Sequence, residues 1–304
     1  MTNPERQTKA QRQNAAREKA RIMREEAKRK QRRNRFIVQG SIGVAIIAVI
    51  AIVVLVVVNV SKPTSNAGPK NMISDGFLLT STTQYVATPA IPHNGKPTPT
   101  TQPDDGKAHI TLYQDLQCPY CDQFEEANDE QLSQWLDAGT ATLEIHPISF
   151  LDSSSSGNKY STRAANALAC VANYDPQDFF AVNKALYDDQ PEEGTNGRTD
   201  AQIIATLKSG GASGTRISDC VKNQTFVGWV GKATNRAMHG TSVPNSSLTQ
   251  VTGTPTIIVN GKQYPSSTAN NLTDPTIFAN FVKSTVSGWS PTAASASPTP
   301  TPAG

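Results

Sequence analysis

The feature that most constrains the fold is a pair of cysteines, Cys118 and Cys121, three positions apart. Pro119 and Tyr120 lie between them, which gives the sequence Cys-Pro-Tyr-Cys. The motif follows residues 109–113, whose alternating pattern predicts a β-strand. Proline suits the first position of a helix, where its missing N–H is not needed. We therefore predict a strand, a tight turn and a helix, with both thiols at the start of the helix.

The helix after the motif is expected over residues 119–136, with Cys121, Phe124 and Leu132 on one apolar face. On this pattern Cys121 is buried and Cys118 is exposed. The unpaired N–H groups at a helix N-terminus lower the pKa of a cysteine there, so that its thiolate can attack a disulfide. We therefore predict that Cys118 attacks, or is attacked by, the substrate and that Cys121 resolves the mixed disulfide.

A zinc knuckle and a purely structural disulfide are the other uses of two cysteines at this spacing. Zinc would need a second pair of ligands, but Cys170 and Cys220 stand alone and the 4 histidines are scattered. A structural disulfide would close so short a loop that little chain entropy is gained. The chain also contains no glycine-rich nucleotide loop. We predict redox chemistry at the motif, no metal site and no dissociable cofactor.

Residues 36–58 form an uncharged stretch of 23 residues, and from position 42 onward each of them is apolar or glycine. As a helix rising about 1.5 Å per residue, this segment spans a hydrocarbon core of about 30 Å. A cleaved signal peptide is the alternative, but its apolar region is usually about 7–15 residues long. We therefore predict one uncleaved transmembrane helix.

Charge is distributed unevenly about this predicted helix. Residues 1–35 carry 13 Lys and Arg against 4 Glu, whereas the remainder carries 15 basic and 21 acidic side chains. The positive-inside rule places residues 1–35 in the cytoplasm, as a basic tail, and the rest of the chain outside. Beside a membrane, such a tail contacts anionic lipid rather than nucleic acid. The expected protein is single-pass in the cell membrane, with an extracytoplasmic catalytic domain.

All four cysteines lie on the predicted outer side, where disulfides persist. If Cys118 pairs with Cys121, then Cys170 and Cys220 remain as a second pair. Both lie in segments with helical periodicity, so that this bond would join two helices. Closing a loop of this length is worth about 4 kcal/mol by chain entropy. Two separately buried thiols are the alternative.

Composition divides the outer part of the chain into three segments. Residues 59–106 are rich in Pro, Thr, Gly and Asn and are expected to form a stalk or linker, apart from a short edge strand at 76–79. Residues 107–288 are long enough to bury one core. Residues 289–304 are rich in Ser, Thr, Pro and Ala and are expected to be disordered.

Apolar periodicity within the folded segment predicts an α/β fold. A strand at 141–148 after the first helix completes a β-α-β unit, which implies a parallel pair of strands. A helical block follows at about 152–248. Its helices are expected at 162–172, 177–187, 200–208 and 217–237. The last elements are strands at 256–259 and 263–264, an Asn260-Gly261 turn between them, and a helix at 275–286 capped by Asp274.

A Gly-Thr-Pro-Thr sequence, with Thr254 and Pro255 at its centre, opens the strand at 256–259. Proline belongs at a strand start because it cannot donate to a ladder. With Cys-Pro-Tyr-Cys upstream and a hairpin and helix downstream, residues 107–288 resemble the thioredoxin fold with an inserted helical subdomain. The inserted helical block makes the resemblance closer to the DsbA-like thiol:disulfide oxidoreductases, particularly the membrane-anchored forms of Gram-positive actinobacteria.

This resemblance implies roles for the matching positions. Cys118 would be the nucleophile and Cys121 the resolving thiol. Thr254 and Pro255 would form a loop with a cis peptide bond, which holds a substrate strand beside the nucleophile.

Two positions differ from the family patterns in a way that bears on the direction of electron flow. Tyr120 stands where strongly oxidising DsbA proteins have histidine, and Leu112 stands where thioredoxin has a buried aspartate. Both differences leave the direction open. The carboxylates nearest to the motif, those of Asp115 and Asp122, are expected to be solvated.

The resemblance implies an extracytoplasmic enzyme that introduces disulfides into reduced or misoxidised proteins of the secreted or cell-envelope class. A quinone-linked disulfide-forming protein of the membrane would reoxidise it. The first alternative is a reductase or isomerase supplied with electrons across the membrane. The second is a peptide-binding module with a structural CxxC, for which replacement of Cys118 by alanine would leave function intact.

Overall fold

The structure is a computed structural model of the 304-residue chain. It describes residues 18, 21, 23–25, 28–30 and 66–292. The chain divides into two compact units, Met1–Pro63 and Thr64–Gly304, and the described residues of the first unit are helical. The predicted membrane span at 36–58 lies outside the described residues. Among the helices that are described, none has the length and the apolar character needed to cross a membrane.

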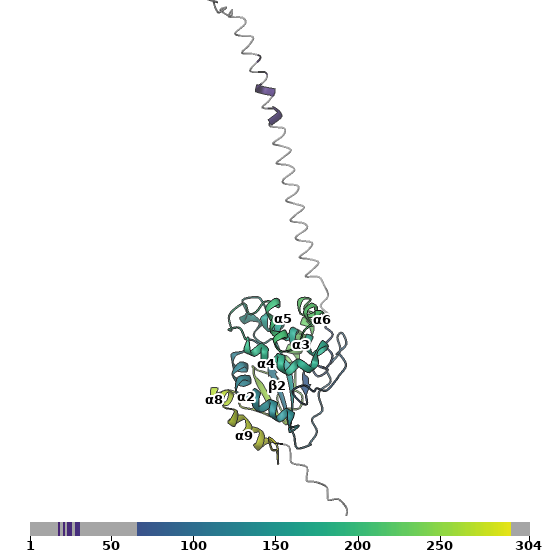
Figure 1. The fold of residues 1–304 in the computed structure, drawn as a ribbon, viewed down its shortest axis with the longest axis vertical. Helices are drawn as coiled ribbons and strands as arrows, with labels where there is room; N and C mark the ends of the chain where they lie inside the picture. Colours follow the sequence, from purple (N-terminus) through teal and green to yellow (C-terminus); the bar gives the residue numbers. More distant parts are fainter. Residues whose placement is uncertain (1–17, 19–20, 22, 26–27, 31–65, 293–304) are drawn as a thin grey trace, which may run out of the picture. The chain divides into compact units, whose positions relative to one another are not determined.

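The second unit is built on one mixed sheet of five strands (Figure 1). Their bounds are β1 Phe77–Leu79, β2 Ala108–Gln114, β3 Ala141–Pro147, β4 Thr256–Val259 and β5 Lys262–Gln263. The order across the sheet is β1-β3-β2-β4-β5, and β2 and β3 are the parallel pair. Helix α2, Pro119–Asp137, connects them. The predicted β-α-β unit and edge strand are therefore confirmed.

Strands β2 and β4 are buried along their whole length because both faces of the sheet are covered. Ile110 and Leu112 on one face belong to the main core. Tyr113 and Ile258 on the other face belong to a second, smaller apolar cluster. Since successive side chains of a strand point to opposite faces, the two clusters fix the register of β2.

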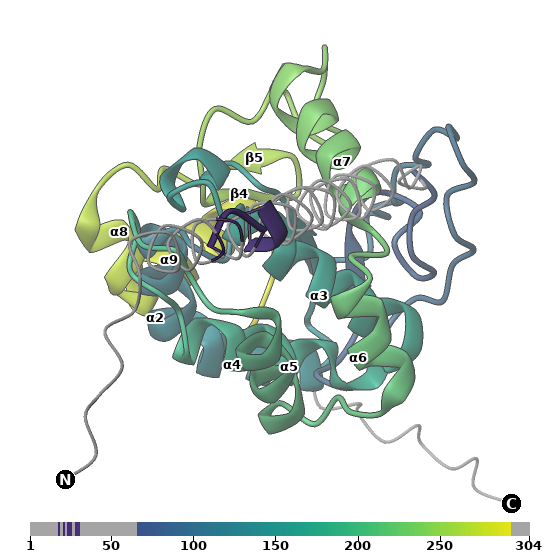
Figure 2. The ribbon, with the colours of Figure 1, turned by 90° about the horizontal axis from the view of Figure 1, so that it is seen from above.

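Five α-helices lie between β3 and β4 in the chain, and α5 and α6 lie at the end of the unit opposite α9 (Figure 1), with α7 labelled in Figure 2. They are α3 Tyr160–Tyr174, α4 Phe179–Asp188, α5 Asp200–Ser209, α6 Thr215–Lys222 and α7 Val227–His239. Twelve of the 15 residues of α3 are buried, and its alanines allow neighbouring helices to approach closely. Thr199 and Gln202 form a capping box at the start of α5.

The single helix predicted at 217–237 is wrong, because the chain forms α6 and α7 with a turn between them. Gln224 in this turn has a φ of 50°. The N–H of Phe226 then donates to the Asn166 side chain of α3 over 2.7 Å. The turn allows both helices to pack on α3, with Trp229 of α7 completely buried.

The predicted stalk is also corrected, because residues 66–106 pack onto the domain. Met72 and Phe77 are completely buried, and Ile91 is 2% exposed. The Phe77 ring stacks on Phe179 of α4 with centroids 3.9 Å apart. A segment rich in proline and threonine can therefore join the core where it carries large apolar side chains at intervals.

Asp75 connects the segment 66–106 to α7 through hydrogen bonds. Its carboxylate accepts two hydrogen bonds of 2.6 Å from the Arg236 guanidinium and one of 3.0 Å from the Trp229 indole N–H. Asp75 is 8% exposed. A carboxylate buried to this extent needs such partners.

The chain ends in two helices, α8 Ala269–Thr273 and α9 Pro275–Thr285. The Asp274 side chain caps α9 by accepting from the N–H of Thr276, as predicted. Trp289 corrects the predicted start of the disordered tail, because it is buried against Trp135 of α2 with ring centroids 4.9 Å apart. The tail from residue 293 onward lies outside the described residues.

Candidate active site

Cys118 is the N-cap of α2 and Pro119 is its first residue, which is the arrangement that the sequence predicts. Both Cys118 and Cys121 are free thiols. Cys121 is 1% exposed, as predicted, but Cys118 is also buried, at 4% exposed, which corrects the expectation that it is open to solvent. Long-range contacts cover it: its Sγ lies 3.2 Å from the Thr254 carbonyl oxygen. Tyr120 is the part of the motif that points outward, with 56% of its surface exposed.

The two thiols differ in their affinity for a proton. The hydrogen bond from the Cys121 thiol lowers the pKa of Cys118 to about 7, and backbone N–H groups of the first turn of α2 add to the effect. Burial raises the pKa of Cys121 well above its usual value, and the neighbouring Cys118 sulfur raises it further. At pH 7 about half of the Cys118 thiol is therefore ionised, whereas Cys121 keeps its proton.

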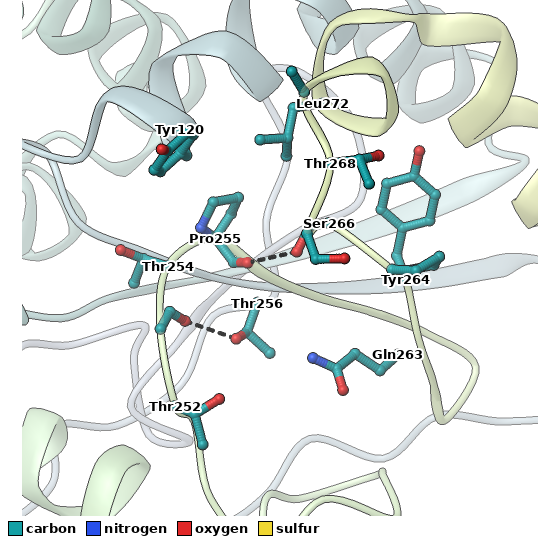
Figure 3. Close-up of a pocket in the computed structure, with 14 residues that line it drawn as sticks. Tyr120, Thr252, Thr254, Pro255, Thr256, Gln263, Tyr264, Ser266, Thr268 and Leu272 are labelled. Atoms are coloured by element: carbon teal, nitrogen blue, oxygen red, sulfur yellow. Dashed lines mark hydrogen bonds between the residues drawn. The ribbon is translucent and has the colours of Figure 1, made fainter.

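The loop opposite the motif contains a cis peptide bond between Thr254 and Pro255, the conformation that the resemblance implied. Two hydroxyl groups hold the loop in place (Figure 3). Thr256 donates to the Gly253 carbonyl over 2.7 Å, and Ser266 donates to the Pro255 carbonyl over 3.0 Å. Within residues 66–292 the buried Thr254 hydroxyl has no partner while Cys118 is a thiol. It favours the thiolate of Cys118, to which it can donate.

A groove of about 740 Å³ begins at this loop and at Tyr120. Fourteen residues line it, and none of them is charged. Six are serines or threonines: Thr252, Thr254, Thr256, Ser266, Ser267 and Thr268. Tyr120 lies on one side of Pro255, and Thr268 and Tyr264 lie on the other (Figure 3). The groove is therefore polar without being charged.

Asp115, expected to be solvated, is instead completely buried beneath the motif. Its carboxylate accepts hydrogen bonds from the N–H groups of Gln117 and Leu151, at 2.9 and 2.8 Å. Burial raises its pKa to about 6, although these two bonds oppose the change. No local pattern around Asp115 indicates this burial, because the Leu151 N–H that bonds to its carboxylate comes from 36 positions away.

Glu125 is a second buried acid, which the sequence reasoning missed. It is 5% exposed, and burial raises its pKa to about 8. Its Oε1 accepts from the Asn183 side chain over 3.1 Å, and Asn183 in turn accepts from Gln114 over 2.6 Å. The helical pattern contained a signal, because Glu125 lies four residues after Cys121, on the buried face of α2.

The exposed side of α2 next to Glu125 is acidic. A hollow of about 300 Å³ there is lined by Asp122, Glu125, Glu126, Asp129, Lys184, Tyr187 and Asp188. Among the described residues, no group of three or more His, Cys, Asp or Glu side chains is placed to hold a metal ion. The uncharged groove and this acidic hollow thus give the surroundings of the motif two different electrostatic characters.

The other two cysteines form a disulfide, the predicted pairing. Cys170 lies on α3 and Cys220 on α6, so the bond joins two helices of the inserted block. Both residues are buried, at 0% and 4% exposed. Since this pair is already oxidised, the exchangeable dithiol of the described structure is the one at the start of α2.

Comparison with known proteins agrees with this geometry. A family model described as thioredoxin matches residues 103–275, which is more than half of the chain. The structure is similar to that of reduced DsbA from Mycobacterium tuberculosis, with 26% identity and a TM-score of 0.51, over 71% of this chain and 95% of that one. It is also similar to MdbA from Actinomyces oris, with 18% identity and a TM-score of 0.51, over 73% and 93%. The second likeness concerns the fold alone.

One curated relative is described as a kinase and not as an oxidoreductase. The serine/threonine-protein kinase PknE of Mycobacterium tuberculosis is 33% identical over 131 residues. The match covers 41% of this chain and 23% of the kinase, so the chain spans about a quarter of the length of the curated relatives it matches.

Proposed function

We propose that this chain, which belongs to the thioredoxin family, is a thiol:disulfide oxidoreductase that acts on proteins through Cys118 and Cys121. The observation that carries the proposal is the difference between these two thiols. Cys118 has a pKa lowered to about 7 and lies against the Thr254 carbonyl, whereas the pKa of Cys121 is raised by burial. One nucleophile and one protonated partner at the start of a helix are the requirements of disulfide exchange.

In the oxidising direction, a substrate thiolate attacks the Sγ of Cys118 in the Cys118–Cys121 disulfide. The bond between the two cysteines breaks, a mixed disulfide forms with Cys118, and Cys121 leaves and takes up a proton. A second substrate thiolate then attacks the substrate sulfur of the mixed disulfide and releases Cys118 as a thiolate. The substrate loses two electrons and two protons, and the protein ends as the dithiol. The lowered pKa of Cys118 makes it a good leaving group in the last step.

The pKa of Cys118 supports the oxidase over the reductase or isomerase. A thiolate that is stable near neutral pH stabilises the reduced protein, and a protein with a stable reduced form is an oxidant. The raised pKa of Cys121 does not oppose this effect, because an ordinary thiol is already protonated at neutral pH and a higher pKa leaves it so. The third reading, a peptide-binding module, assigns no role to the difference between the thiols.

The place of action belongs to the same proposal. The uncharged stretch at 36–58 and the basic residues before it support a single-pass anchor, with the catalytic unit outside the cytoplasm. Substrates would then be reduced or misoxidised proteins of the secreted or cell-envelope class. A quinone-linked disulfide-forming protein of the same membrane would reoxidise the dithiol, and the basic tail would contact anionic lipid.

The reduction potential of the Cys118–Cys121 pair tests this function. The protein is equilibrated with defined ratios of reduced and oxidised glutathione, and the fraction of dithiol is read by alkylation and mass spectrometry. A potential between about −120 and −180 mV supports the oxidase, and one near −230 mV or lower refutes it in favour of a reductase. A Cys118→Ala variant that keeps full function refutes both and supports the binding module.

A further inference from the structure

A cavity of about 200 Å³ lies beside the second apolar cluster, on the face of the sheet opposite the main core. Residues 74–99, strands β2 and β3, α7 and the loop after α7 all contribute to its wall. The apolar part of the wall includes Ile148, Val243 and three prolines, Pro97, Pro99 and Pro244. Among the described residues that line the cavity, none belongs to the Cys-Pro-Tyr-Cys motif or to the groove beside the cis-proline loop. The exchange reaction therefore leaves this cavity without a role.

The hydroxyl of Tyr113 is a donor at this cavity that has no partner. Tyr113 lines the wall, is 4% exposed, and stacks on the His146 ring with centroids 4.4 Å apart. Within residues 66–292 its hydroxyl makes no hydrogen bond, yet its oxygen is not among the polar atoms that the protein seals off completely. Burial raises the pKa of this phenol, and the charges of Glu144 and Asp75 raise it further, so that it stays protonated. A nearly buried donor of this kind gains a hydrogen bond when an acceptor enters the cavity.

Arg236 adds further donors to the same wall without adding net charge. Its Nε and Nη2 atoms each lie 2.6 Å from the Asp75 carboxylate. Its Nη1 atom makes no hydrogen bond within the described part of the chain, and both residues line the cavity. Because Arg236 and Asp75 neutralise each other, an anion that entered would lose water and meet no unpaired cation on this part of the wall. The wall thus favours a neutral ligand with an acceptor oxygen.

We propose that this cavity binds a small uncharged ring molecule with a carbonyl oxygen, the oxygen accepting from Tyr113 and the ring packing against the prolines. A cavity of about 150 Å³ is enough for a benzene ring. The volume of about 200 Å³ therefore accommodates one ring with a short substituent. Aromatic and cyclic ketones belong to this class. The cavity shares no lining residue with the groove at the motif, so the proposal is independent of the exchange reaction.

Tryptophan indole signals in a ¹H–¹⁵N spectrum report on the cavity from inside the protein. The Trp229 indole N–H donates to Asp75 in the cavity wall, whereas the Trp289 indole N–H donates to the Thr140 carbonyl. The chain contains 3 tryptophans, so Trp135→Phe and Trp289→Phe variants assign all the signals. Acetophenone, added to the full-length protein in phosphatidylcholine nanodiscs, should shift the Trp229 signal and leave the Trp289 signal unchanged. Benzoate, an anion of similar size, should shift neither.

Tyr113→Phe removes the donor and keeps the ring. It should raise the apparent Kd for acetophenone about tenfold, the effect of one lost hydrogen bond. Ethylbenzene has the same ring and no acceptor, so Tyr113→Phe should bind it as well as the parent protein does. Ala237→Leu should abolish both shifts because leucine fills the cavity, and Asn235→Leu, which adds leucine at an exposed residue of α7, is its matched control. Partition of the ligand into lipid cancels, because each comparison uses one ligand at one lipid concentration.

Any of four results would overturn the proposal. The first is an unshifted Trp229 signal at acetophenone concentrations up to about 10 mM, which would largely fill even a millimolar site. The second is an equal affinity of the parent protein and Tyr113→Phe for acetophenone. The third is an unchanged shift in Ala237→Leu, because the ligand would then bind elsewhere, and the fourth is a benzoate shift as large as that of acetophenone. If Ala237→Leu does not fold, Tyr113→Phe decides the outcome alone.

Discussion

Replacement of Glu125 by glutamine is expected to stabilise the protein at neutral pH. Glu125 is 5% exposed, and burial raises its pKa from 4.5 to about 8. At pH 7 the folded protein therefore holds a proton on this carboxyl group, whereas the unfolded chain has released it. Glutamine has nearly the same shape as the protonated acid, and its Oε1 can still accept the 3.1 Å hydrogen bond from Asn183. The substitution thus removes the cost of protonation and keeps the contact.

The magnitude follows from the two pKa values. Below pH 4.5 both states are protonated, so the group contributes no pH dependence. Above it, the free energy of unfolding falls by about 1.36 kcal/mol per pH unit, until the folded state also ionises near pH 8. The penalty at pH 7 is therefore about 3 kcal/mol. Glu125→Gln should be more stable than the parent protein by about this amount at pH 7, and about equally stable at pH 4.

Urea unfolding at several pH values between 4 and 8 measures the difference. Glu126→Gln is the matched control, because it removes the same formal charge from the next residue of α2, whose side chain is exposed. It should change the free energy of unfolding by less than about 0.5 kcal/mol. If the parent protein and Glu125→Gln show parallel stability profiles over this range, Glu125 is not protonated in the folded state and the reasoning is refuted.

Three further predictions concern other parts of the site and fold. The alkylation rate of Cys118 by iodoacetamide should rise with pH around a midpoint near 7, and a midpoint near the ordinary value of about 8.5 would contradict the lowered pKa. Replacement of Cys170 and Cys220 by alanine should lower the free energy of unfolding in urea by about 4 kcal/mol, since the bond closes a loop of 50 residues. Asp75→Asn should lower it by roughly 2 kcal/mol, because Arg236 loses its ionic partner while remaining partly exposed, and an unchanged urea midpoint would show that the ion pair is not needed.

Much of the fold could be predicted because its signals are local. Pro119 at the start of α2, the Asn260-Gly261 turn and the Asp274 cap each depend on residues close to one another in the sequence. The alternation of apolar and polar residues predicted the strands, and apolar residues at helical spacing predicted most of the helices. The single helix predicted at 217–237 was wrong because its break is not a local signal. The turn between α6 and α7 is held by a hydrogen bond from the Phe226 N–H to α3, and no strong helix breaker marks it in the sequence.

Residue types and their spacing already identify which residues carry the chemistry: two thiols at a helix start, a proline at a strand start and a second pair of cysteines. The environment of these residues depends on tertiary contacts. The Thr254 carbonyl that covers Cys118 comes from 136 positions away, and Asn183, the partner of Glu125, comes from 58. The free energy of a charge depends on which groups replace water around it, and those groups are distant in the chain. Motif spacing therefore identifies the reactive atoms, whereas their pKa values and the neutrality of the groove are properties of the packed fold.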